Sequence, residues 1–174
     1  MQVSKWIKKE RRLWHKHFVP SLIAGIAVAI LTLLFEFNAF NVVLFASVGA
    51  SAVILANIHT HHLTKLRTTI IAYVISIIVS IFVFLLNILR PFDLAVNLFL
   101  VIFGIAILLY LFDSFHPPAI TAGASFILLE RPVVDLVYLI MAIIVLLVLV
   151  RFFAYVFSQH LPMKQFYKEF AREF

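Results

Sequence analysis

Residues 68–89 read TTIIAYVISIIVSIFVFLLNIL and contain no charged side chain. A helix needs about 20 consecutive, mainly apolar residues to cross the hydrocarbon core of a bilayer. The strands of a transmembrane barrel instead alternate apolar and polar residues over about ten positions, and this stretch does not alternate. It therefore predicts a transmembrane α-helix.

Three further apolar runs, at residues 22–35, 94–112 and 133–150, accompany this stretch. Of the 174 residues, 64% are hydrophobic and 13% are charged, whereas about 25% of a typical soluble domain is charged. The first run is short, but residues 18–40 contain a single acidic side chain, Glu36. We therefore expect an all-α polytopic membrane protein whose transmembrane domain spans residues 19–157.

The net charge of +6 is concentrated at the two ends of the chain. The basic side chains there are Lys5, Lys8, Lys9, Arg11, Arg12 and Lys16 before the first run, and Arg151, Lys164, Lys168 and Arg172 after the last. Basic clusters beside apolar helices favour the cytoplasmic side and attract anionic lipid headgroups. We expect both termini in the cytoplasm, the protein in a plasma membrane such as that of a bacterium, and lipid rather than nucleic acid at the basic ends.

Apolar side chains recur at helical spacing within both basic ends. Trp6 and Trp14 lie among the N-terminal bases, and Phe166, Phe170 and Phe174 follow one another at intervals of four residues. A basic amphipathic helix lies in the headgroup layer with its aromatic face toward the acyl chains. Residues 1–18 and 158–174 are therefore predicted to be interfacial helices.

Two short segments of the sequence resemble each other. The first, FASVGASAVIL, occupies residues 45–55, and the second, AITAGASFILL, occupies residues 119–129. Their Gly-Ala-Ser motifs are offset by 123 − 49 = 74 residues. A long apolar run precedes and follows each segment, so the pattern predicts a duplicated unit of helix, short segment and helix.

Two topologies fit this duplication. If both short segments cross the membrane, the protein has six spans and the two halves form a 3+3 inverted repeat. If both are re-entrant, it has four spans and parallel halves. The charge bias slightly favours six, because Lys65 and Arg67 then lie inside. Length favours the re-entrant form of residues 117–130, because fourteen helical residues reach only about 21 Å.

The stretch DSFHPPAITAGASFILLE, residues 113–130, places polar residues and two prolines between apolar runs. Proline suits the first turn of a helix, and it pushes the residue before it out of the helical region. We therefore expect a break at His116 and a new helix from Pro117. Non-helical backbone at membrane depth is tolerated inside protein or along a water-filled cavity, and the free N–H groups of a helix N-terminus suit anions.

The break and the two Gly-Ala-Ser segments together define a candidate anion pathway. Its residues are His116, Pro117, Pro118, Thr121, Gly123, Ser125, Gly49, Ser51 and Asp113. His116 is a candidate anion contact, proton carrier or gate, and a buried Asp113 would favour its protonated form. Gly49 and Gly123 would let helix backbones approach closely. The alternative is a tight loop at the membrane surface with His116 among the headgroups.

DSFHPPA, taken together with FASVGASAVIL, resembles the HPP family of integral membrane proteins over roughly residues 20–157. This family is named for its His-Pro-Pro motif and is usually described as having four spans. Some members are implicated in nitrite transport. The resemblance carries over His116, Pro117 and Pro118 as the signature, and Gly49, Ala50 and Ser51 as its companion segment.

Other polar residues carry weaker signals. The cluster of His59, His61 and His62 has no carboxylate nearby in the sequence, and the chain has no cysteine, so a polar loop is favoured over a metal site. Tyr73, Ser76 and Ser80 share one helix face, which fits either a pathway lining or packing between helices. No phosphate-binding loop or nucleophilic triad is present in the sequence, and we expect neither an enzyme nor a cofactor.

The sequence thus favours a secondary transporter or channel for a small inorganic anion, with nitrite as the leading candidate by resemblance. The alternative is a non-transporting membrane scaffold or an accessory subunit of a larger complex. Six spans within 19.9 kDa would make a thin bundle, so we also expect a homo-oligomer, namely a dimer.

Overall fold

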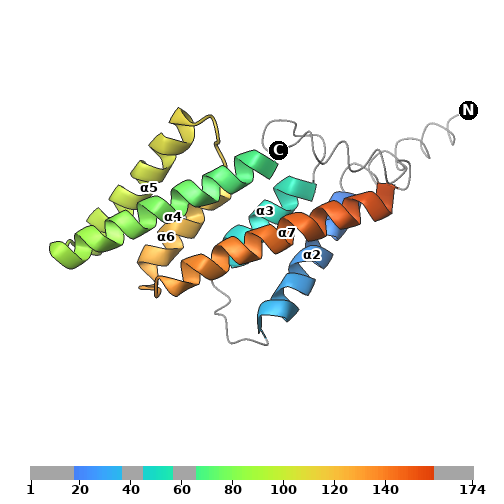
Figure 1. Ribbon diagram of the computed structural model, residues 1–174, viewed down its shortest axis with the longest axis horizontal. Helices are drawn as coiled ribbons and strands as arrows, with labels where there is room; N and C mark the ends of the chain where they lie inside the picture. Colours follow the sequence, from blue (N-terminus) through green and yellow to red (C-terminus); the bar gives the residue numbers. More distant parts are fainter. Residues whose placement is uncertain (1–17, 37–44, 57–65, 159–174) are drawn as a thin grey trace, which may run out of the picture.

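The computed structural model describes residues 18–36, 45–56 and 66–158, and its regular elements there are all helices. The helices are α2 (Val19–Glu36), α3 (Phe45–Ala56), α4 (Leu66–Leu89), α5 (Leu94–Leu111), α6 (Pro117–Leu128) and α7 (Val134–Ser158). Each runs roughly opposite to the helix before it (Figure 1). The predicted interfacial helices and the cluster of His59, His61 and His62 lie outside the described residues.

Three helices in the described part of the chain are long and apolar enough to cross a membrane: Leu66–Leu89, Leu94–Leu111 and Val134–Ala154. This confirms the prediction of an all-helical protein with apolar spans. The other three apolar helices are shorter, and α3 and α6 have 12 residues each. At about 1.5 Å per residue each of these two is about 18 Å long, against a hydrocarbon core of about 30 Å.

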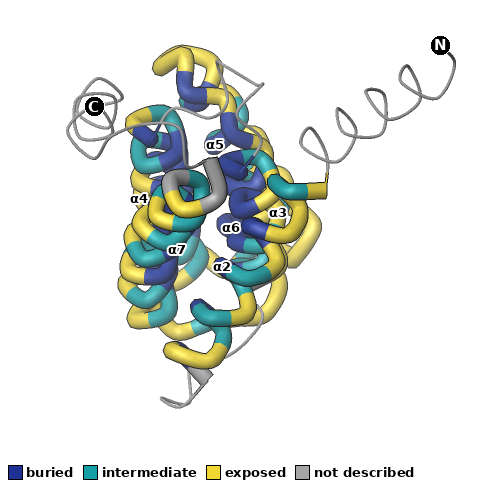
Figure 2. The backbone as a smooth tube through the Cα atoms, turned by 90° about the vertical axis from the view of Figure 1, so that its right-hand side faces the viewer, coloured by how far each residue is buried: buried dark blue, intermediate teal, exposed yellow. Residues whose placement is uncertain are grey.

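The two short helices lie inside the bundle rather than on its outside. Helix α6 packs against α3, α4 and α5, and α3 packs against α2, α6 and α7. Small side chains permit this packing, because Ala52 on α3 and Ala119 and Ala122 on α6 are completely buried. Figure 2 shows the buried residues along the inner faces of the helices. The core therefore includes one residue of each Gly-Ala-Ser motif, namely Ser51 and Gly123.

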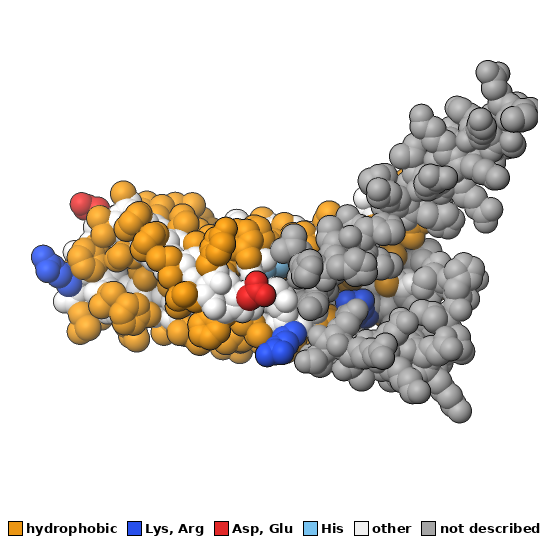
Figure 3. All heavy atoms as spheres, turned by 90° about the horizontal axis from the view of Figure 1, so that it is seen from above, with side chains coloured by type: hydrophobic (Ala, Val, Ile, Leu, Met, Phe, Trp, Pro, Cys, Tyr) orange, Lys and Arg blue, Asp and Glu red, His pale blue; other side chains and the backbone are white. Residues whose placement is uncertain are grey.

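The outer faces of the long helices are apolar. Ile78, Phe82 and Leu85 project from α4, and Phe99 and Phe103 project from α5 and stack on each other with ring centroids 5.3 Å apart. Figure 3 shows hydrophobic side chains over most of the described face, with few charged ones. An apolar exterior of this extent is typical of contact with lipid rather than with water.

Candidate functional site

His116 is the residue immediately before α6, and Pro117 and Pro118 are the first two residues of that helix. The backbone of His116 is extended, with φ −135° and ψ 94°, as expected for a residue before proline. The predicted helix break at His116 and helix start at Pro117 are therefore confirmed.

The break reaches into the bundle. His116 is completely buried, and its ring contacts Ser51 on α3 and Tyr73 on α4. Tyr73 lies seven residues past the start of α4, which corresponds to a depth of about 10 Å along the helix axis. Ser114 is also buried, whereas Phe115 between the two points outward. His116 therefore lies inside the helix bundle rather than on the surface of the protein.

A chain of hydrogen bonds links His116 to α3 and α4. The Nε2 atom of His116 lies 2.9 Å from the Oγ atom of Ser51, which lies 2.8 Å from the hydroxyl oxygen of Tyr73. The Tyr73 hydroxyl donates to the backbone carbonyl of Ser47 at 3.2 Å. A carbonyl can only accept, so a chain that ends on this carbonyl runs from His116 through Ser51 and Tyr73 to Ser47.

The direction of the chain determines which nitrogen of His116 carries the proton. When the Tyr73 hydroxyl gives its one proton to the Ser47 carbonyl, its oxygen accepts from Ser51, and Ser51 accepts from Nε2–H of the imidazole. In the neutral ring the other nitrogen, Nδ1, is then a bare acceptor. Nδ1 is buried and has no hydrogen-bond partner among the described residues. The site therefore contains one buried ring nitrogen whose hydrogen-bonding capacity is unused among the described residues.

A second set of polar contacts continues along the seam between α4 and α6. Ser76 donates to the backbone carbonyl of Ala119 at 2.6 Å. Gly123 allows this close approach, because a Cβ atom there would lie 3.0 Å from the Oγ atom of Ser76 and 2.9 Å from that of Ser80, and would also collide with Ile105. The face of α4 that carries Tyr73, Ser76 and Ser80 thus turns toward the short helices and away from lipid.

Sequence comparison identifies the family of this chain. The family model described as HPP, transmembrane region, matches residues 9–167. The chain belongs to the HPP transmembrane family. No curated protein and no solved structure matches it. In this HPP chain the His-Pro-Pro motif forms the start of α6, and the companion segment supplies Ser51, which bonds the motif's histidine.

Some of the predicted pathway residues lie outside this cluster. Asp113 is exposed and has a left-handed backbone with φ 48°, so it does not form a buried pair with His116. Thr121 is exposed, and its hydroxyl reaches only the carbonyl of Pro117 at 3.5 Å. Ser125 is half-buried. A Cβ atom on Gly49 would meet no described atom within 4 Å, so the expected close approach at that glycine is also wrong.

The amide groups at the start of α6 do not serve an anion in the way the sequence suggested. Pro117 and Pro118 have no N–H, and the N–H of Ala119 bonds the carbonyl of His116 at 3.0 Å. The first three helical residues therefore offer no free amide donor. His116 is a buried polar side chain at this point that could donate a hydrogen bond to an anion.

Two residues of the cluster were not predicted as site residues. Ser47 lies one helical turn before Ser51, so both face the same side of α3, and Tyr73 begins the polar face of α4. The spacing of the hydroxyl side chains along α3 and α4 is the sequence feature that could have indicated both residues. In the described part of this HPP chain, no three His, Asp or Glu side chains gather as a metal site would require.

Proposed function

We propose that this chain is a secondary transporter or channel for a small inorganic anion, and that the anion passes His116. One observation carries the proposal: a completely buried imidazole has a ring nitrogen without a partner among the described residues. Burying a polar atom without a hydrogen bond costs about 1–3 kcal/mol. Ionisable side chains inside membrane proteins commonly mark ion pathways and proton relays. Family membership supports nitrite as the leading substrate.

The hydrogen-bond chain suggests how His116 would handle an anion. A bare Nδ1 lone pair repels an anion but accepts a proton. Once Nδ1 is protonated, the ring is a cation and offers an N–H to an oxyanion such as nitrite. The proton and the anion then form a neutral pair, and this pair avoids the large cost of burying an unpaired charge. We therefore expect flux to increase as the pH falls and more protons are supplied.

The proposal includes an architecture. In each half, α2–α4 and α5–α7, a helix of 12 residues lies between two helices of 18 to 25 residues, and this order supports a 3+3 inverted repeat. Transporters with such repeats often bind substrate near the midplane where the repeats meet. In this arrangement both termini face the cytoplasm of a plasma membrane, and two copies of the thin bundle form a dimer.

The direct test is anion flux in proteoliposomes that contain the purified full-length protein. Nitrite uptake is measured at two pH values for the native protein, for His116→Ala, and for Thr121→Ala as a matched control on the exposed side of the same helix. Nitrous acid crosses bilayers without a carrier, so empty liposomes are measured at each pH. We expect native flux above this background, loss of that flux in His116→Ala, and near-native flux in the control.

Two results would count against the proposal. Native flux equal to that of empty liposomes, with nitrate, formate and chloride also inactive, would refute the transporter and favour a membrane scaffold. Flux that persists unchanged in His116→Ala would retain a transport function but place the pathway elsewhere in the protein.

A further inference from the structure

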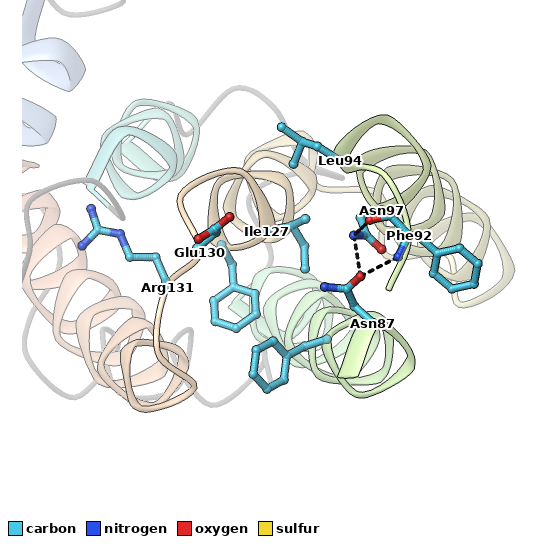
Figure 4. A pocket seen from close by; sticks show the side chains of 9 residues that line it. Asn87, Phe92, Leu94, Asn97, Ile127, Glu130 and Arg131 are labelled. Atoms are coloured by element: carbon cyan, nitrogen blue, oxygen red, sulfur yellow. Dashed lines mark hydrogen bonds between the residues drawn. The ribbon is translucent and has the colours of Figure 1, made fainter. Parts of the chain in front are cut away.

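A cavity of about 400 Å³ lies at the opposite end of the bundle from His116. It is formed where α4 turns into α5 and where α6 turns into α7 (Figure 4). Asn87 lines it and lies fourteen residues after Tyr73 on α4, which corresponds to about 21 Å along the helix axis. The cavity is therefore separate from the His116 cluster but lies on the same helix.

The cavity has a polar wall that α4 and α5 hold in place. Asn97 donates through Nδ2 to the Oδ1 atom of Asn87 at 3.0 Å and to the carbonyl of Phe92 at 3.2 Å, and Phe92 donates its backbone N–H to the same Oδ1 at 3.0 Å. These bonds fix both amides and leave the Oδ1 atom of Asn97 buried without a partner among the described residues. The amide nitrogen of Asn87 points toward the space between α4 and α6 (Figure 4).

An aromatic pair bridges α4 and α6 at the cavity. Phe84 on α4 and Phe126 on α6 line the cavity, and their ring centroids lie 6.1 Å apart at 64°. Phe126 is almost completely buried. Glu130 and Arg131 also line the cavity, so its lining carries one acidic and one basic side chain besides the two asparagines.

Polar groups reappear on the inner side of this pair. Ser80 lies one helical turn before Phe84 on α4 and is completely buried, and its Oγ atom has no partner among the described residues. Ser76 and then Tyr73 follow on the same face, leading to His116. The α4–α6 seam thus presents a polar cavity, an aromatic pair, two serines and the buried imidazole, in that order.

We infer that Phe84 and Phe126 form a closed gate between this cavity and the His116 site. The cavity is then the mouth at one end of the route for the same small, hydrated anion. The unpartnered hydroxyl of Ser80 becomes a donor to the anion once the rings separate. The identity of the anion rests on the proposed function. Access past the two rings can be tested without any transport assay.

The chain has no cysteine, so single cysteines can be introduced without removing native ones. We would compare Asn87→Cys, Ser80→Cys and Ser80→Cys combined with Phe84→Ala, using a small negatively charged methanethiosulfonate on the full-length protein in liposomes. The matched control combines Ser80→Cys with Phe82→Ala, because Phe82 lies on the outer face of the same helix.

We expect fast labelling of Asn87→Cys and slow labelling of Ser80→Cys. Removing the Phe84 ring should raise the labelling rate at Ser80→Cys by about tenfold or more, which corresponds to about 1.4 kcal/mol of opening free energy. Removing the Phe82 ring should not change it. Size-exclusion chromatography identifies variants that fail to fold, and Phe84→Leu replaces Phe84→Ala if the smaller side chain is not tolerated.

Two outcomes would overturn the gate. Ser80→Cys that reacts as fast as Asn87→Cys in the otherwise native chain would show that the rings do not obstruct access. A rate at Ser80→Cys that neither Phe84 variant changes would show that the route does not pass them. If labelling follows the expectation while nitrite flux is absent, the gate stands and the nitrite proposal fails.

Discussion

Replacing Gly123 and Gly49 by alanine, one at a time, compares two identical Gly-Ala-Ser motifs in different surroundings. At Gly123 the new methyl group would lie 3.0 Å from the Oγ atom of Ser76 and 2.9 Å from that of Ser80, closer than ordinary van der Waals contact. Ser76 cannot move without weakening its 2.6 Å bond to α6. At Gly49 the methyl group would meet no described atom within 4 Å.

These contacts give opposite expected effects on the free energy of unfolding. Overpacking costs about 1–3 kcal/mol, and weakening a hydrogen bond costs about 1 kcal/mol more. Alanine stabilises a helix interior by about 1 kcal/mol relative to glycine. Gly123→Ala should therefore destabilise by about 1–3 kcal/mol, and Gly49→Ala should stabilise by up to about 1 kcal/mol.

The assay is reversible unfolding in mixed micelles with increasing dodecyl sulfate, followed by circular dichroism. Both variants are compared with the native chain under the same conditions. Equal shifts for the two glycines, or a larger loss at Gly49→Ala, would refute the packing of α6 against α4 described above.

Three further substitutions test individual contacts. Tyr73→Phe removes the donor to the Ser47 carbonyl that fixes the direction of the hydrogen-bond chain, so ¹⁵N NMR should show His116 moving from the Nε2–H tautomer toward a mixture; an unchanged tautomer would contradict the assignment. Ser76→Ala should lower the free energy of unfolding by about 0.5–1.5 kcal/mol in the dodecyl sulfate assay, and no loss would show that its bond to α6 is not formed. Asp113→Asn should leave nitrite flux unchanged because Asp113 is exposed, whereas a strong loss would restore the buried pair rejected above.

The long helices and the position of the break could be predicted from the sequence. Uncharged apolar runs specify α4, α5 and α7 because lipid imposes a minimum length on a span. Pro117 fixes the start of α6 because its backbone angle is preset and the residue before it avoids the helical region. Both rules act within a few residues of one chain segment, so they need no knowledge of the partners.

The packing around the break could not be predicted in the same way. Gly49 and Gly123 are both followed by Ala-Ser but face different surroundings, because the partner helix decides what a glycine meets. Asp113 lies three residues before His116, yet its left-handed backbone leaves it outside the core. The lack of free amides at the start of α6 could be predicted in part, because Pro117 and Pro118 have no backbone N–H.

The measurement that tests the central claim most directly is nitrite binding observed at the imidazole itself. The seven histidines are labelled with ¹⁵N in the purified full-length protein, and His116→Gln identifies the resonances of His116. On addition of nitrite near pH 6, the account predicts that the Nδ1 signal of His116 moves toward that of a protonated nitrogen. The other histidines should change much less. A titration in which His116 does not respond while nitrite is transported would contradict the account.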